Sequence, residues 1–185
     1  MFDLRAVPFV ALALSACASL PPTPATPYLP AGVYGVYLDN DTGAIDQSSW
    51  AFASPNNTRN NPVAAAKAVI ALEYLSGALR ENPRWIGMDL STKLHVAQAR
   101  DNLRQIVGIR PDAPPQAVVN ALLLLAEGLQ FGNQAEAAQA LTSPVFTAPP
   151  PETLQRLSNL PYDQTANLAT ARAGAQVLPM GGTRS

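Results

Sequence analysis

Few side chains in this chain are suited to nucleophilic, acid–base or metal chemistry. Cys17 is the only cysteine and His95 the only histidine among 185 residues. A thiolate is a nucleophile and a metal ligand, and an imidazole can act as a general base. A typical zinc site uses three or four His, Cys or carboxylate ligands, which this composition does not supply in the usual combination. We therefore predict no metal site, assign no cofactor and assign no catalytic residue.

His95 falls beside a predicted apolar helical stripe, next to Val96 and near Lys93 and Asp101. A lone helical histidine without neighbouring ligands usually lies on the solvated surface. The sequence also lacks the G-x-S-x-G and S-x-x-K motifs and a glycine-rich phosphate loop. A cleft that held His95 beside an aspartate and a serine would instead indicate a divergent hydrolase, and this alternative stays open.

Residues 1–17 have the three parts of an export signal. Arg5 and the amino terminus outweigh Asp3, an apolar run follows over 6–14, and small residues lead to Cys17. The stretch Leu14-Ser15-Ala16-Cys17 resembles the lipobox of bacterial lipoproteins. The resemblance covers only this signal, and it implies that the Cys17 thiol is diacylated and becomes the new N-terminus after cleavage. A palmitate-type lipid anchor would then hold the protein at a membrane.

The residue after the cysteine bears on which membrane that is. Ala18 in place of an aspartate resembles the outer-membrane sorting signal, which implies the periplasmic face of the outer membrane. A lipid on Cys17 would leave the mature chain without a thiol. Ala16-Cys17-Ala18 also fits a small-x-small cleavage site, and a cut after Ala18 would give a secreted or periplasmic soluble protein. The apolar run is too short for a transmembrane helix, which needs about 20 residues.

Composition limits the fold and the partners. The chain carries 12 Lys+Arg and 13 Asp+Glu, without a basic cluster, which argues against nucleic-acid binding. Charged residues make up 14%, below the roughly 25% of ordinary domains. Alanine, the best helix former, is abundant. These features predict one mainly α-helical domain.

The chain is predicted to divide into a signal at 1–17, a proline-rich tether at 18–32, a helical domain at 33–178 and a flexible tail at 179–185. An extended polyproline tether would hold the domain about 40 Å from the membrane. In the alternative interpretation, this segment lies against the fold as a strap.

The helical domain is predicted to be a single bundle of five to six helices. Asn61 and Pro62 form a strong helix start, and a helix apolar on nearly all sides follows it. The predicted helices cover residues 62–81, 116–131, 134–141, 152–160 and 164–178, and a further helix, capped by Asp89 or Ser91, runs to about residue 107. The β-forming run at 33–38 and the turn-like sequence at 39–43 predict a short β-hairpin near 33–46. Asp39 and Asp41 begin like a calcium loop, but the EF-hand pattern then fails.

Arg84 and Trp85, after the first predicted helix, are candidate binding residues. Both types are enriched at binding hot spots, and arginine can stack over tryptophan. Together with Trp50 and Tyr37, they could line a groove near the N-terminal loop. In the alternative interpretation, Trp85 and Trp50 close the end of the helical core.

The leading interpretation is a non-enzymatic, lipid-anchored domain that acts by binding, as an accessory or scaffold component of the cell envelope. Its partners would be the membrane and an envelope protein. One alternative is an envelope module that holds a small ligand, a glycan or a lipid, between the 33–60 segment and the first predicted helix. The mature domain resembles no known family in its motifs.

Overall fold

The computed structural model of the chain describes residues 20–36 and 39–180, and side chains up to residue 177. This part of the chain is mainly α-helical, as predicted, but it holds seven α-helices rather than five or six. They are α1 (Asn40–Ala53), α2 (Pro62–Glu81), α3 (Leu90–Val107), α4 (Pro115–Gln130), α5 (Gln134–Leu141), α6 (Pro150–Ser158) and α7 (Gln164–Met180). The short 3₁₀ helices η1 (Pro55–Asn57) and η2 (Pro83–Trp85) flank α2.

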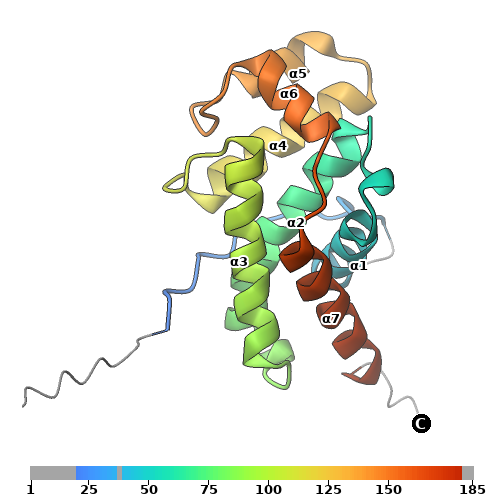
Figure 1. Cartoon of the computed structure of the whole chain (residues 1–185), viewed down its shortest axis with the longest axis vertical. Coiled ribbons are helices and arrows are strands. Elements are labelled where there is room, and N and C mark those ends of the chain that lie inside the picture. The colour runs from blue at the N-terminus through green and yellow to red at the C-terminus, as the bar shows by residue number, and fades with distance from the viewer. Residues whose placement is uncertain (1–19, 37–38, 181–185) are drawn as a thin grey trace, which may run out of the picture.

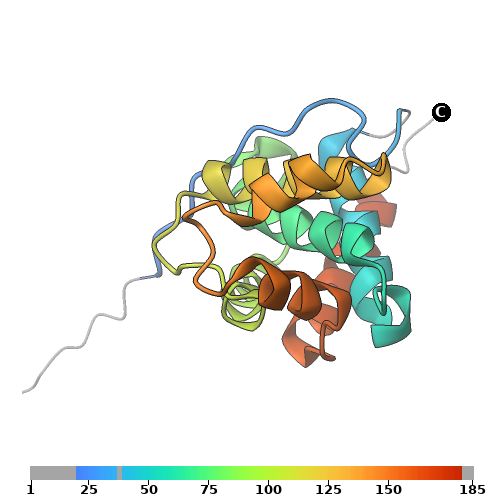
Figure 2. The same cartoon turned by 90° about the horizontal axis from the view of Figure 1, so that it is seen from above.

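Helix α2, whose sequence is apolar on nearly all sides, is the centre of the bundle. The Asn61 side chain accepts the backbone N–H of Ala64 at 3.0 Å, and Pro62 occupies the first turn. The helix packs against α1, α3, α4 and α6 (Figures 1 and 2). By length and composition α2 could also cross a membrane, but 78% of its most apolar window is buried among these helices. Their packing accounts for its apolar sequence.

The predicted β-hairpin near 33–46 is wrong, because the segment that was expected to turn begins helix α1. Asp39 is the N-cap, and its carboxylate accepts the backbone N–H of Thr42 at 3.0 Å. Aspartate and asparagine favour helix caps as strongly as turns, so the same letters fit both structures. Within the described residues there is no strand, and Ile109 and Phe146 form an isolated bridge.

Helices α5 and α7 pack on helices that contact α2. Helix α7 lies between α1 and α3 in the lower half of Figure 1 and packs on both. Helices α4, α5 and α6 cover the other half, where α5 contacts both α4 and α6. Helix α7 extends to Met180, two residues beyond its predicted end. Residues 181–185, the rest of the predicted tail, lie outside the described residues.

Residues 20–36, irregular over 20–30 and turned over 31–36, form a segment that we call the strap. It crosses α2 and then follows α4 (Figure 2). Pro27 and Leu29 are buried, and the Gln116 side chain pairs with both the N–H and the C=O of Tyr28, at 2.7 and 3.2 Å. The described part of the predicted 18–32 tether therefore lies along the fold, as in the strap alternative.

Candidate functional site

Two predicted site residues, Cys17 and Tyr37, lie outside the described residues. The strap begins three positions after Cys17, at Leu20, whose side chain is 57% exposed. At the next residue, the Pro21 carbonyl accepts hydrogen bonds from both terminal nitrogens of Arg80, at 3.1 and 3.2 Å. The first described residues therefore lie at the surface, where Arg80 of α2 holds the Pro21 carbonyl.

Trp85 is an interior side chain that joins three elements. It is 1% exposed, and its indole N–H donates to the Asp41 carboxylate at 2.8 Å. The same carboxylate accepts the Asn82 amide at 3.1 Å and the Tyr74 hydroxyl at 2.5 Å. Burial and this hydrogen bond raise the pKa of Tyr74. Asp41 therefore ties the start of α1 to α2 and η2.

Arg84 stacks on the Trp85 ring, 4.7 Å from its centroid, and pairs with Asp39 at 2.9 Å. The cation–π pair considered from the sequence is therefore present, but the indole ring itself is in the core. Trp50 lies elsewhere: it is 48% exposed and follows Asp41 by nine residues on α1, about 14 Å along the helix axis. The structure brings Arg84 and Trp85 together and keeps Trp50 apart from them.

A buried ion pair that the sequence analysis missed joins α2 to α3. Arg104 donates to both carboxylate oxygens of Glu73, at 2.6 and 2.7 Å, and the two side chains are 2% and 0% exposed. Its remaining terminal nitrogen donates to the carbonyls of Arg110, Pro111 and Ala113. An acid in the middle of the apolar 62–81 stretch, Glu73, was the available signal. This pair fixes the loop that leads into α4.

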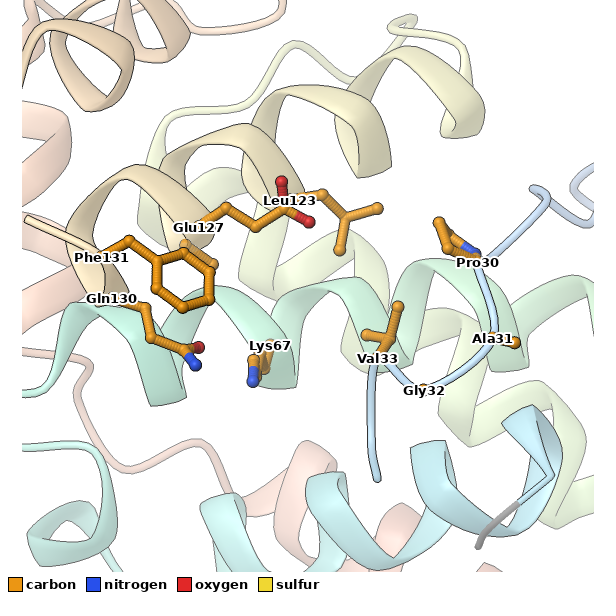
Figure 3. A pocket seen from close by; sticks show the side chains of 10 residues that line it. Pro30, Ala31, Gly32, Val33, Lys67, Leu123, Glu127, Gln130 and Phe131 are labelled. Atoms are coloured by element: carbon orange, nitrogen blue, oxygen red, sulfur yellow. The ribbon is translucent and has the colours of Figure 1, made fainter. Parts of the chain in front are cut away.

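The strap forms one wall of a surface groove of about 210 Å³. Pro30–Val33 lie at one end, the Phe131 ring lies at the other, and Lys67 of α2 lies between them (Figure 3). Leu123 and Glu127 of α4 also line the groove. The Phe131 side chain is 78% exposed. Ligand pockets usually measure about 300–1,000 Å³. This groove therefore suits one side chain of a partner better than an enclosed ligand.

His95 lines a second pocket, of about 190 Å³, between α3 and α7. Its other lining residues are Gln98, Gln164, Thr165, Leu168 and Arg172. The aspartate and serine that would favour a hydrolase are not among them. No group of three His, Cys, Asp or Glu side chains suited to a metal ion occurs in the part of the chain that the structure describes. Asp39 and Asp41, the start of the calcium-like sequence, instead bind protein donors.

Comparison with protein-family models, with curated proteins and with solved structures gave no match. The function of this chain is therefore inferred from its own residues.

Proposed function

We propose that this chain is a bacterial lipoprotein, anchored through a lipid on Cys17 at the periplasmic face of the outer membrane. Its helical domain binds an envelope protein, as an accessory or scaffold component, and performs no catalysis. The observation that carries the proposal is the lipobox-like stretch Leu14–Cys17, which ends three positions before the exposed Leu20. A lipid on Cys17 can therefore enter a bilayer while the described fold stays intact.

The expected lipid makes this anchor permanent. A single acyl chain binds a membrane only marginally and reversibly, and stable anchoring takes at least two signals. Lipoproteins with this signal normally carry three chains, two on the thiol-linked glycerol and one on the new amino terminus. Since no basic cluster accompanies the signal in the sequence, the acyl chains supply most of the membrane affinity.

The strap groove is the surface that we assign to the protein partner. An exposed aromatic ring beside an apolar wall, with charged groups at the rim, has the anatomy of a small interface core. Phe131 and Leu123 supply the apolar part, while Lys67 and Glu127 supply charges of both signs. A matching partner offers an apolar side chain flanked by one acidic and one basic group.

Labelled palmitate tests the anchor in bacterial cells. The wild-type protein is expected to take up the label, and Cys17→Ser is expected to lose it completely because the acceptor thiol is gone. Ala18→Asp serves as the control, since it keeps the thiol: it should retain the label and change only the membrane in which the protein fractionates. Label that persists in Cys17→Ser, or an unlabelled wild type cut after Ala18, would overturn the anchor.

A photo-crosslinking residue at position 131 tests the groove. It is expected to trap a defined envelope protein, and Glu127→Lys should weaken the adduct because it reverses one rim charge. The same crosslinker at Tyr162, which is 56% exposed outside the groove, is the control. Equal adducts from both positions would show that the groove is not the contact surface.

A further inference from the structure

The pocket between α3 and α7 has an unusual chemical bias. Its polar side chains are the Arg172 guanidinium, the His95 imidazole, the Gln98 and Gln164 amides and the Thr165 hydroxyl. All of these groups can donate hydrogen bonds, and no acidic side chain lines the pocket. A pocket of donors with a fixed positive charge is complementary to an anion.

The two helices present these groups to one another. Thr165, Leu168 and Arg172 follow a three-four spacing, so they share one face of α7. His95 and Gln98 are three residues apart on α3, which packs against α7 (Figure 1). Side chains from both helices therefore converge on the same space of about 190 Å³.

His95 lines the pocket with only part of its imidazole. Within the described residues, its Nδ1 is the single buried side-chain nitrogen or oxygen without a hydrogen-bond partner. Because that nitrogen is closed to solvent, a ligand in the pocket meets the other atoms of the side chain.

Neighbouring acids do not neutralise Arg172 in the described structure, where it takes part in no ion pair. Asp163, next to Gln164, is already engaged. Its oxygens accept the Ala166 backbone N–H at 2.6 Å and the Asn102 amide at 3.2 Å. The guanidinium is therefore left to bind an external partner, and its planar fork matches an oxyanion.

We propose that the His95–Arg172 pocket binds an oxyanion, the carboxylate or phosphate group of a small molecule. The guanidinium of Arg172 holds the charge, and the imidazole, amide and hydroxyl groups hydrogen-bond the oxygens. The pocket volume limits the bound part to a small group rather than a whole large ligand. The site does not depend on the lipid anchor, because its residues all lie within α3 and α7.

His95 provides the readout, because it is the only histidine and gives a single imidazole C2–H proton signal in NMR. The full chain carrying Cys17→Ser is titrated with inorganic phosphate and with acetate, at fixed pH and ionic strength, with chloride as the reference. A saturable shift with an oxyanion but not with chloride is expected. The tighter of the two oxyanions identifies the ligand as a phosphate or a carboxylate.

Arg172→Gln is expected to weaken the binding by about tenfold or more, since it removes the charge-assisted contact. Arg156→Gln is the matched control, because that exposed arginine pairs with Glu152 outside the pocket. Circular dichroism verifies that both variants are folded. The proposal is overturned if the His95 signal shifts equally with chloride. It is also overturned if Arg172→Gln binds phosphate and acetate as tightly as Arg156→Gln and the unsubstituted protein do.

Discussion

Asp41 is a buried carboxylate whose hydrogen-bond donors come from α2, the end of that helix and the 3₁₀ helix that follows it. Its oxygens accept Tyr74 from α2, Asn82 from the end of α2 and Trp85 from η2. Removing any one donor leaves the carboxylate with the others, whereas removing the large Trp85 ring also opens a cavity. Trp85 is therefore the side chain whose loss should be felt most.

Trp85→Ala is predicted to destabilise the fold by about 3–5 kcal/mol, the usual cost of truncating a fully buried aromatic. The control is Trp50→Ala, at a residue that is 48% exposed, where the change should stay within about 1 kcal/mol. Urea unfolding followed by circular dichroism measures both. If Trp85→Ala were as stable as Trp50→Ala and lost a partner instead, Trp85 would belong to a binding groove.

Arg104 is the buried ion-pair partner of Glu73. Arg104→Met is predicted to cost about 3–5 kcal/mol, because it leaves Glu73 as an unpaired charge at 0% exposure and frees three loop carbonyls. Arg156→Met breaks the exposed pair with Glu152 and should cost about 1 kcal/mol or less. Equal urea midpoints for the two variants would contradict the structural role of the buried pair.

The contacts of single residues could be predicted from the sequence where the two partners are close together in the chain. The Asn61 cap and the stacking of Arg84 on Trp85 both involve neighbours in the chain. The contacts of Asp41 and Glu73 join residues 31 to 44 positions apart, so only the packed helices reveal them. The His95–Arg172 pocket could not be predicted either, because its residues are far apart in the chain and meet only where α7 packs against α3.

At the scale of elements, the close packing of the strap on α2 depends on Gly77. A Cβ atom added at Gly77 would lie 2.5 Å from the Thr26 hydroxyl and 2.8 Å from the Pro24 carbonyl and the Thr26 nitrogen. Two of these atoms belong to the strap backbone, which cannot rotate away as a side chain can. Gly77 therefore lets the extended chain cross α2 at close range.

Gly77→Ala is predicted to release the strap over residues 20–30 while the helices stay folded, since alanine also favours α2 by about 1 kcal/mol. Hydrogen exchange should show faster exchange in the strap and little change in α2. Gly174→Ala is the matched helical control, because its Cβ would meet only side-chain atoms, the nearest being the Ser49 hydroxyl at 3.2 Å. Unchanged protection of the strap in Gly77→Ala would contradict this packing role.

The six helices after residue 60 were predictable because each has a periodic apolar face and clear end signals, such as Pro62, Gly108 and Asp163. Helix α1 was not. It follows a β-forming run and begins with residues that are typical of turns, and it is held by contacts with α2 and α7 rather than by a strong local pattern. Tertiary packing decides such a segment.

At the scale of the whole molecule, the docked strap changes the expected distance between domain and membrane. Leu20 is three positions after Cys17, and three positions of fully extended chain span at most about 10 Å. A fully extended 18–32 tether would give about 40 Å. The lipoprotein proposal combined with the docked strap therefore places the domain close to the lipid headgroups.

Neutron reflectometry on a supported bilayer that carries the lipidated protein measures this distance. The domain is predicted to begin within about 10 Å of the headgroups. Gly77→Ala should move it outward by freeing the strap, and Gly174→Ala should not. A wild-type domain standing about 40 Å away would show that the strap leaves the fold at the membrane.

The intact mass of the protein purified from bacterial membranes tests the lipid anchor on Cys17 most directly. We expect a chain that begins at Cys17 and carries a thioether-linked diacylglycerol and an amide-linked acyl chain. A chain that begins at Ser19 without lipid, or one that still begins at Met1, would contradict it.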